Sequence, residues 1–399
     1  MSEQSRGGPS DWRARLEASL HRLWFDAPTT PARLLAAALL TPLAWLVGLV
    51  SRRKRSRIEA ARSAERRDSR PDRSSAARPV VIVIGNLVAG GAGKTPLTLA
   101  VAQHLQDQGL QIGLIARGTG SLGRDMAQPV GPDDDAGKAG DEAVLLARRS
   151  GAPVYVARQR AQALQRLVTE HPEVQVVLAD DGLQHVALRR DLQIVVIDQR
   201  GLGNGRLLPA GPLREPPDML AGVDAVVLNR GWQTAAAADS ATRAIDASIA
   251  ALALMTPRFE SRLQIRDVLP LAAYRTSTGP AIDHGHGPAG VQGLAALGEG
   301  PIAAVAGIAN PESFFGLLEA LDLSIIRYPL GDHAPLDREW LAGLPQATIV
   351  MTEKDAVKCP DDSSARVFVL RVQACPEPAL FDWLATTLRR RHDLGPTTA

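Results

Sequence analysis

The chain has 399 residues, of which 45% are hydrophobic and 22% charged, the balance of an ordinary globular protein. This composition excludes wholesale disorder, and the length fits two domains. The two cysteines, Cys359 and Cys375, are too few for a disulfide framework or a four-ligand zinc site.

Charge is unevenly distributed along the chain. Residues 51–78 carry eleven Lys or Arg against four Asp or Glu, whereas residues 79–399 carry a net charge of −6. A protein that binds nucleic acid usually has its positive charge on the folded domain. Here the folded part is acidic and the positive charge lies in a short arm. We therefore expect no nucleic acid partner and predict contact with a membrane surface.

An apolar run precedes the basic arm. Leu34 to Val50 contains no charged residue, and as a helix it would be about 25 Å long, against a hydrocarbon core of about 30 Å. Pro42, in its middle, favours a kink or a break. We expect an N-terminal membrane-associated helix within residues 1–50 and a basic linker or helix over 51–78, with the large domain on the cytoplasmic side. Three alternatives compete for this run. A secretory signal peptide fits poorly, because the run starts over thirty residues into the chain and no A-x-A site follows before the basic cluster. A core helix of a soluble domain is the second, and a membrane anchor, either one short span or an interfacial helix in one leaflet, is the third and is favoured.

The globular part begins with a buried strand and a phosphate-binding loop. Val80 to Asn86 is apolar and β-branched without alternation, as parallel strands covered on both faces are. Glycine N–H groups of such a loop surround phosphate oxygens, Lys94 reaches the β- and γ-phosphates, and the Thr95 hydroxyl ligates Mg²⁺. Val88 stands where the strict motif has its first glycine. The predicted nucleotide-binding residues are Val88, Ala89, Gly90, Gly91, Ala92, Gly93, Lys94 and Thr95.

A second predicted metal-binding element follows a later strand. VQVVLAD ends in Asp180, and Asp181 comes next. An Asp after four apolar residues, at the carboxyl end of a strand, is the Walker B arrangement that holds Mg²⁺ directly or through water. His185 lies just beyond, at the same predicted edge. Upstream, Asp141 and Glu142 begin a predicted helix, where acidic residues are ordinary partners of the helix dipole.

The predicted nucleotide is ATP. No D-x-x-G motif follows the strand at the required spacing, because Gly182 comes directly after Asp181. Lys354 and Asp355 are not part of an N/T-K-x-D motif. The guanine-specific elements are missing, so adenine is favoured.

A second α/β unit is predicted in the C-terminal part. Residues 257–275 alternate polar and apolar side chains and are expected to form extended linker strands, followed by a Gly-, Pro- and His-rich loop. GDHAPLD, at the end of a later strand, contains the acid–His pair Asp332 and His333. The predicted fold class is α/β, with a P-loop NTPase-like parallel sheet domain (79–257), linker strands and a Gly/Pro-rich loop (258–300) and a smaller C-terminal α/β domain (301–399).

Together these motifs resemble the tetraacyldisaccharide 4′-kinase family of lipid A biosynthesis. The resemblance covers about residues 22 to 390 and departs from the family at Ala116 and Thr119, where Ser-Arg-Gly-Tyr is usual, and in the insertion at 276–300. The stretches that carry it are IGN before GGAGKTP, Arg117-Gly118, GDE at Asp141, DDGLQH at Asp180, RDLQIVVID, GNGRLLPAGPLREP, GIANPESFF, Asp332-His333 and MTEKDAVK.

The resemblance implies transfer of the γ-phosphate of ATP to the 4′-hydroxyl of a tetraacylated glucosamine disaccharide 1-phosphate, which forms lipid IVA, with ATP and Mg²⁺ as cofactors. It also implies an acylated lipid substrate and a place on the cytoplasmic face of the bacterial inner membrane. By motif, Asp141 is the base, assisted by His333, while Asp180 and Asp181 handle Mg²⁺ and His185 supports the site. A membrane-bound regulatory ATPase and an anchored structural protein with a vestigial nucleotide site are the alternatives from other classes.

Overall fold

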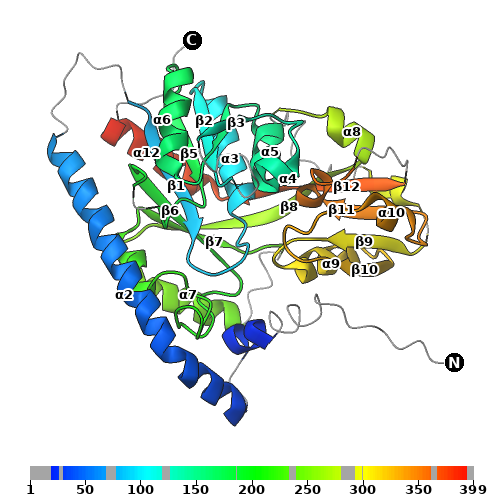
Figure 1. Ribbon diagram of the computed structural model, residues 1–399, viewed down its shortest axis with the longest axis horizontal. Coiled ribbons are helices and arrows are strands. Elements are labelled where there is room, and N and C mark those ends of the chain that lie inside the picture. Colours follow the sequence, from blue (N-terminus) through cyan, green and yellow to red (C-terminus); the bar gives the residue numbers. More distant parts are fainter. Residues whose placement is uncertain are drawn as a thin grey trace.

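The computed structural model describes residues 19–26, 30–68, 78–118, 126–185, 187–232, 240–279, 293–298, 300–360 and 366–392. Its centre is a twelve-stranded sheet with the strand order β10-β9-β11-β12-β8-β7-β6-β1-β5-β2-β4-β3. Helices lie on both faces of this sheet (Figure 1), as in other α/β folds. The predicted fold class is confirmed.

The N-terminal unit is a parallel sheet with one antiparallel strand, β3, at its edge. Strand β1 lies between β5 and β6, and Ile84 pairs with Asp180 on one side and with Ile194 on the other. The three-residue strands β3 and β4 are too short for a periodic signal and were not predicted. The elements are β1 (Val80–Asn86), α3 (Lys94–Asp107), β2 (Ile112–Ala116), β3 (Gln128–Val130), α4 (Ala136–Ala139), α5 (Asp141–Ser150), β4 (Val154–Val156), α6 (Arg160–Glu170), β5 (Val176–Asp180), β6 (Leu192–Asp198), η1 (Pro217–Gly222), β7 (Ala225–Asn229) and α7 (Ser240–Leu252).

The C-terminal unit extends the same sheet. Strands β10, β9, β11 and β12 run parallel to one another, and β12 then pairs antiparallel with β8, which joins β7 of the N-terminal unit. Cys359 and Cys375 are free thiols. The elements are β8 (Arg258–Pro270), α8 (Leu271–Thr276), η4 (Leu294–Leu297), β9 (Ile302–Ala306), α9 (Pro311–Ala320), β10 (Ile325–Pro329), α10 (Arg338–Ala342), β11 (Ile349–Thr352), α11 (Glu353–Ala356), β12 (Val367–Pro376) and α12 (Pro378–His392).

Strands β8 and β12 connect the two units. Extended structure was predicted over residues 257–275, and β8 is one strand of 13 residues, but the last part of this stretch forms helix α8. After β12 the chain returns to the N-terminal unit, where Phe381 of α12 stacks on His104 of α3 with ring centroids 4.2 Å apart. Leu380, Leu384 and Leu388 of α12 are buried in the core on the same face.

The two faces of β1 supply separate hydrophobic cores, because successive side chains of a strand point to opposite sides. Val80, Ile82 and Ile84 lie in the core under α3, α5 and α12. Val81 and Val83 lie in the core on the opposite face. The strand is therefore buried on both sides, as its unbroken apolar sequence predicts.

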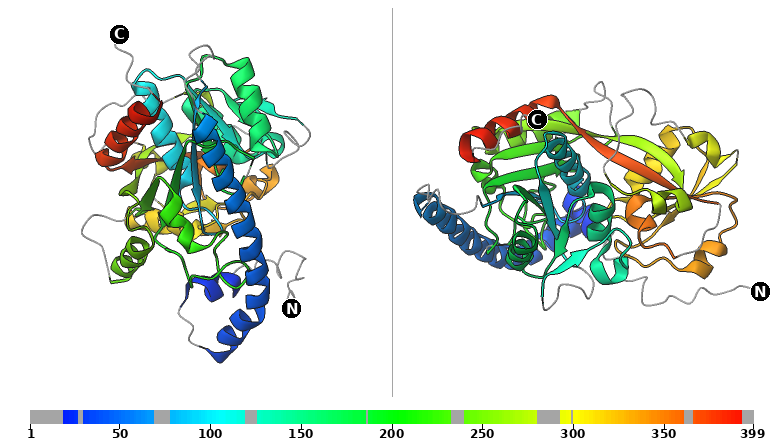
Figure 2. Two further views of the ribbon diagram at one scale, coloured as in Figure 1. Left: turned by 90° about the vertical axis from the view of Figure 1, so that its left-hand side faces the viewer. Right: turned by 90° about the horizontal axis from the view of Figure 1, so that it is seen from above.

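Helix α2 (Pro31–Asp68) runs along the outside of the N-terminal unit, at the end of the molecule remote from β10 (Figure 2). It continues as a helix through Pro42, so the chain is not broken there, and it also includes most of the basic segment. Pro42 is exposed, which leaves the packed face of the helix free of its ring. Within the described chain, Leu34–Arg57 is the one helical stretch long and apolar enough to cross a membrane, a test that core helices and signal sequences also pass.

Helix α5 joins the two units through a buried ion pair. Arg149 Nη1 lies 2.6 and 2.7 Å from the two carboxylate oxygens of Glu353 in α11. Both side chains are less than a tenth exposed. Glu353 also accepts a hydrogen bond from the backbone N–H of Val372 in β12. The pair therefore connects α5 to two elements of the C-terminal unit.

We predict that Arg149→Ala lowers the free energy of unfolding by about 3–5 kcal/mol, because it leaves the Glu353 carboxylate buried without its partner. Urea unfolding of the full chain measures this loss. Arg327→Ala is the matched control, since Arg327 pairs with Glu312 and Glu319 at the surface and its removal should have little measurable effect. Arg149→Met combined with Glu353→Leu should recover most of the stability, and a single-variant loss no larger than the control's would contradict the prediction.

Candidate active site

The phosphate loop (residues 88–95) joins β1 to α3 and contains two residues in the left-handed region. Gly90 and Gly93 have φ values of 90° and 84°. A Cβ atom at Gly93 would lie 2.1 Å from Asn229 Nδ2, so only glycine fits there. Asn229, at the end of β7, donates from Nδ2 to the carbonyl of Ala92 at 3.0 Å. The loop is thus held against the carboxyl edge of the sheet.

The missing first glycine of the loop has a structural reason. Val88 is 2% exposed, packs into the core and forms an isolated β-bridge with Leu213. The next residue, Ala89, donates its N–H to the carbonyl of Pro212 at 2.8 Å. This part of the loop is extended and paired with the segment after β6, so it does not need a glycine.

Asn86, the last residue of β1, organises the loop from beneath. It is fully buried, and its Nδ2 donates to the carbonyls of Val88 at 2.7 Å and Gly90 at 3.0 Å. Its Oδ1 accepts a hydrogen bond from Lys94 Nζ at 3.1 Å. Sequence reasoning did not select Asn86 as a site residue. The available signal was an amide at the end of a buried strand, directly before a glycine-rich loop.

Thr95 and Asp180 meet because β1 and β5 are parallel neighbours in register. Thr95 Oγ1 donates to Asp180 Oδ2 at 2.8 Å, and Thr98 Oγ1 lies 3.5 Å from Oδ1. Burial raises the pKa of Asp180 to about 6, and the negative charge of Glu142 adds to this effect. The positive charge of Lys94 is therefore too small to hold the pKa of the Asp180 carboxylate at its ordinary value.

Asp181 has a different environment. Its backbone is in the left-handed region at a φ of 52°. Its carboxylate lies 3.4 Å from Lys94 Nζ and 3.3 Å from Arg214 Nη1. Burial raises the pKa of Asp181, but the positive charges of Lys94, Arg214 and Arg160 outweigh burial and hold it below its ordinary value.

Thr95 and Asp180 fit a Mg²⁺ ion. Their adjacent hydroxyl and carboxylate oxygens are hard ligands, and a cation would stabilise the carboxylate whose pKa is raised. Within the described residues there is no cluster of three or more His, Cys, Asp or Glu arranged for a metal. Mg²⁺ is commonly bound by one or two carboxylates together with substrate phosphates, so the donor set is that of a metal–nucleotide site.

Asp141 and His333 meet across the two units. Asp141 is the first residue of α5 and 3% exposed, and His333 lies in the loop after β10 with a φ of 61°. His333 Nδ1 is 2.9 and 3.0 Å from the two carboxylate oxygens of Asp141. Both residues line a cavity of about 690 Å³, together with residues of α4, α8 and α11.

The Asp141–His333 hydrogen bond shifts both pKa values. Burial raises the pKa of Asp141, but the hydrogen bond with His333 and the charge of Lys354 outweigh burial and lower it. The same hydrogen bond is the largest effect on His333 and raises its pKa above 6.5, although burial opposes the change. Asp141 is therefore ionised at neutral pH.

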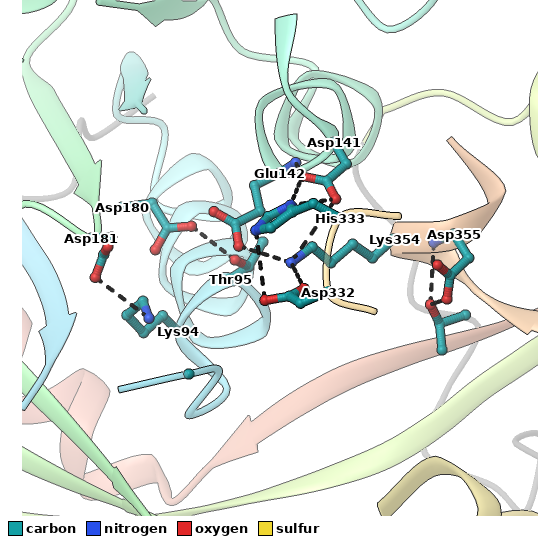
Figure 3. A network of polar contacts seen from close by, with 12 residues as sticks. Lys94, Thr95, Asp141, Glu142, Asp180, Asp181, Asp332, His333, Lys354 and Asp355 are labelled. Carbon is teal, nitrogen blue, oxygen red and sulfur yellow. Dashed lines mark hydrogen bonds and ion pairs between the residues drawn. The ribbon is translucent and has the colours of Figure 1, made fainter. Parts of the chain in front are cut away.

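Lys354 of α11 lies among three carboxylates (Figure 3). Its Nζ is 3.0 Å from Asp332 Oδ1, 3.2 Å from Glu142 Oε1 and 4.0 Å from Asp141 Oδ2. Burial lowers the pKa of Lys354, but the three negative charges outweigh burial and raise it. Sequence reasoning did not select Lys354 and Glu142 as site residues. The available signal for Lys354 was its place two residues after the end of strand β11 of the C-terminal unit.

Among the described residues, the His185 side chain does not take part in the hydrogen bonds and ion pairs that Asp141 and Lys354 form. Burial and the nearby charge of Arg160 lower its pKa to about 4, so the ring is neutral. In the described part of the chain, its ring forms no hydrogen bond with Asp141, Asp180 or Asp181, and its catalytic role stays a prediction. Thr119, where the family resemblance departs, lies outside the described residues, as does most of the insertion at 276–300.

The fold and the site are those of a P-loop phosphotransferase, because the glycine-rich loop between β1 and α3 and the ionised Asp141 lie at the same edge of the N-terminal unit. Residues 36–389 match the family model of the tetraacyldisaccharide-1-P 4′-kinases. The chain belongs to this family.

Similar proteins agree with this assignment. A tetraacyldisaccharide 4′-kinase from Dechloromonas aromatica is 42% identical over 373 residues, which cover 93% of this chain and 98% of the relative. One from Ectopseudomonas mendocina is 40% identical over 356 residues, which cover 89% of this chain and 94% of the relative. The crystal structure of LpxK from Aquifex aeolicus in complex with ATP has the same fold, with a TM-score of 0.65 at 21% identity, covering 90% of this chain and 99% of that one.

We predict that Asn86→Ala raises the KM for ATP about tenfold and changes kcat less, because the loop loses its support while Lys94 remains. Steady-state kinetics with ATP as the varied substrate measure the split. Asn204→Ala is the matched control, since Asn204 also donates from Nδ2 to two backbone carbonyls but does not contact the phosphate loop. An unchanged KM for ATP in Asn86→Ala would show that the loop keeps its shape without this side chain.

Proposed function

We propose that the chain transfers the γ-phosphoryl group of ATP to the 4′-hydroxyl of a tetraacylated glucosamine disaccharide 1-phosphate, which yields lipid IVA and ADP. The observation that carries this proposal is the hydrogen-bonded pair Asp141 and His333. The family and the relatives are named for this kinase activity.

On the nucleotide side, the phosphate loop and Lys94 bind the triphosphate. Lys94 Nζ rests between Asn86 and Asp181 and can turn toward phosphate oxygens without leaving the loop. Thr95 and Asp180 would hold Mg²⁺, which when bound neutralises charge on the β- and γ-phosphates. Asp181 keeps its negative charge and fixes the direction of Lys94 and Arg214.

On the acceptor side, Asp141 is the base. As the 4′-oxygen forms its bond to the γ-phosphorus, the bond from that phosphorus to the β,γ-bridging oxygen breaks, ADP leaves, and the hydroxyl proton passes to the Asp141 carboxylate. His333 Nδ1 orients this carboxylate and shares the proton. Positioned proton removal of this kind contributes about 10²–10⁴-fold to a rate.

Lys354 keeps the acidic residues of the site together. Asp141, Glu142 and Asp332 would repel one another, and the ammonium group among them stabilises all three as carboxylates. Since Lys354 and Asp332 belong to the C-terminal unit, this balance of charge requires both units. It supports a reaction that takes place between them.

A regulatory ATPase would hydrolyse ATP without an acceptor, whereas a kinase requires one. The decisive experiment is transfer of labelled phosphate from ATP to a panel of acylated disaccharides, separated by chromatography. Label in the 4′-phosphorylated lipid supports the kinase. ATP turnover that does not depend on added lipid would instead support a hydrolysis switch.

We predict that Asp141→Ala and His333→Ala each lower kcat strongly and that the double variant is little worse than Asp141→Ala. Groups that act as one unit are non-additive in this way. ATP binding, measured by calorimetry, should be retained in all three variants because neither residue belongs to the phosphate loop. Fully multiplicative losses would show that the two residues act separately.

The pH dependence of kcat/KM provides an independent test of whether Asp141 and His333 act together. The raised pKa of His333 places the acid limb of the profile above pH 6.5, since the imidazole becomes charged as the pH falls and weakens Asp141 as a base. In His333→Ala this limb should move to lower pH, toward the range of a carboxyl group. The acceptor phosphate titrates in both enzymes alike, so coincident profiles would exclude His333 from the unit.

We also infer that α2 lies in the interface of the cytoplasmic face of the inner membrane and enters one leaflet. Its small residues face the protein, where Ala37 and Ala44 are buried and Gly48 touches Leu207. Its large apolar residues are exposed, which leaves an unpartnered hydrophobic surface along the helix. These residues are Leu34, Leu35, Leu39, Leu43, Trp45, Leu46, Leu49 and Val50.

The contacts of α2 favour the interfacial arrangement over a span. Thr41, near the middle of the apolar run, accepts a hydrogen bond from Arg206 at 3.1 Å. A spanning helix would carry this guanidinium group into the hydrocarbon, where a charge is costly. Further along, Ser51 donates to the carbonyl of Arg214 and Arg55 to that of Met219. The exposed Arg52 and Arg53 can bind anionic headgroups, at about 1 kcal/mol each.

We predict that Leu39→Glu combined with Leu46→Glu reduces binding to anionic vesicles at least tenfold, because both side chains are exposed on the apolar face. Vesicle co-sedimentation at low and high salt measures apolar and electrostatic binding separately. Ile326→Glu is the control, since it places a charge on an exposed apolar residue of β10, far from α2. Unchanged binding of the double variant would mean that α2 does not hold the protein on the membrane.

A further inference from the structure

A short helix at the start of the described chain packs against the segment that follows β6. It spans residues 19–25 and is drawn in dark blue in Figure 1. Trp24 Nε1 donates to the carbonyl of Pro209 at 3.0 Å, and the carbonyl of Trp24 accepts the N–H of Asn204 at 2.8 Å. Asn204 Nδ2 also donates to the carbonyl of Leu23 at 3.2 Å. The short helix is therefore fixed to this segment by several hydrogen bonds.

Gly203 permits the close approach of the two segments. Its φ is 56°, and a Cβ atom there would lie 2.7 Å from the carbonyl oxygen of Trp24 and 3.2 Å from Phe25 Cε1. Phe25 is half-buried against the core on this face of the sheet. The His21 ring lies beside it, with the ring centroids 4.7 Å apart. The segment after β6 is thus shaped to receive an aromatic side chain from the start of the chain.

Arg200 lies between Phe25 and the phosphate loop. Its guanidinium carbon is 5.2 Å from the centroid of the Phe25 ring, a cation–π distance. Burial and the positive charge of Arg200 lower the pKa of His21, so the same charge acts on both rings. On its other side, Arg200 Nη2 donates to the carbonyl of Gly91 at 2.7 Å. Asp198, at the end of β6, accepts a hydrogen bond from Arg200 Nε at 2.9 Å and fixes the guanidinium group in this place.

The hydrogen bond from Arg200 to Gly91 affects phosphate binding through the geometry of the peptide group. In a trans peptide the C=O and the N–H point in opposite directions. A Gly91 carbonyl bound to Arg200 therefore directs the N–H of Ala92 away from Arg200, and the N–H groups of such a loop are what bind phosphate oxygens. Asn86 holds the carbonyl of Gly90 in the same way. Successive peptide groups of the loop are thus oriented by side chains from the ends of β1 and β6.

We propose that Phe25 is a positioning residue of the nucleotide site, which acts through Arg200 on the peptide group between Gly91 and Ala92. This inference rests on the proposed kinase function, with ATP as the phosphate donor. The ring of Phe25 keeps the guanidinium group on the loop carbonyl, so the loop has its binding geometry before ATP arrives. A site that is ordered in advance loses less free energy when it binds. The chain before α2 therefore contributes to ATP binding.

The test measures ATP binding to the full chain by calorimetry in detergent solution, without vesicles or acceptor lipid. Phe25→Leu keeps an apolar side chain but loses the face of the ring, and it should weaken ATP binding about three- to tenfold. Phe25→Tyr keeps the ring and should bind ATP as the wild type does. Arg200→Ala removes the hydrogen bond to Gly91 itself and should weaken ATP binding about ten- to hundredfold.

A double-mutant cycle separates positioning from packing. In the Arg200→Ala background, Phe25→Leu should cause no further loss of ATP binding, because the residue through which Phe25 acts is gone. Phe381→Leu is the matched control, since Phe381 is also a half-buried aromatic residue stacked on a histidine, His104, but belongs to α12. This control should lower the melting temperature and leave ATP binding unchanged.

With an acceptor lipid present, Phe25→Leu should raise the KM for ATP and leave kcat nearly unchanged. Full ATP affinity in Phe25→Leu, an equal loss in Phe25→Tyr, or losses that multiply in the double variant would each overturn the assignment. If Arg200→Ala does not fold, Arg200→Gln replaces it in the cycle, because it also lacks the charge that the ring attracts. An enzyme that binds ATP but phosphorylates no acylated disaccharide would instead contradict the proposed function.

Discussion

Helix α5 carries opposite charges at its two ends, and the C-terminal unit balances both. Asp141 and Glu142 meet His333 and Lys354 at its first turn, while Arg149 meets Glu353 at its last. Buried charges are costly without partners, so the helix has one favourable position against the C-terminal unit. The carboxylate proposed as the base is the first residue of this helix. Its position, its ionisation and its histidine partner all depend on the contact between the two units.

The segment 200–214, between β6 and η1, links the nucleotide site to helix α2. On one side Arg200 donates to the carbonyl of Gly91 at 2.7 Å, and the carbonyl of Pro212 accepts the N–H of Ala89. On the other side Trp24 donates to the carbonyl of Pro209, and Arg206 donates to Thr41 of α2. One short stretch of chain therefore holds the phosphate loop and the apolar helix in a fixed relation. With α2 in the membrane interface as proposed, this relation would set the height of the loop above the membrane.

Several departures from the usual rules of backbone conformation and burial occur in the candidate site. Asp181 and His333 are non-glycine residues with positive φ, and Asp180 is a buried carboxylate with a raised pKa. Arg160 is a buried cation whose Nε and Nη2 find no hydrogen-bond partner among the described residues. Asp180, Asp181 and Arg160 lie at the carboxyl edge of the parallel strands of the N-terminal unit, and His333 follows β10 of the C-terminal unit, whose strands run the opposite way. Away from this edge, β1, β5 and β6 are continuous apolar strands with their side chains in two cores. The regular part of the sheet is stable enough to hold the strained part in place.

The sequence alone determined those strands and loops whose formation depends only on residues close together in the chain. The apolar strand before a glycine-rich loop predicted β1 and the loop, and four apolar residues before Asp180 predicted the strand that brings it to the edge. These predictions held because a buried strand and a helix N-terminus need only short stretches of sequence. Asp141 and His333 came from resemblance to a family, since no local rule joins residues 192 positions apart. Only the tertiary structure decided which charges meet, such as Lys354 with three carboxylates, and that Arg160 forms no ion pair with an acid among the described residues. It also decided that α2 buries its small residues and exposes its large ones. The sequence alone gives the charge of a side chain, but the partners of that charge depend on how distant strands are ordered in the sheet.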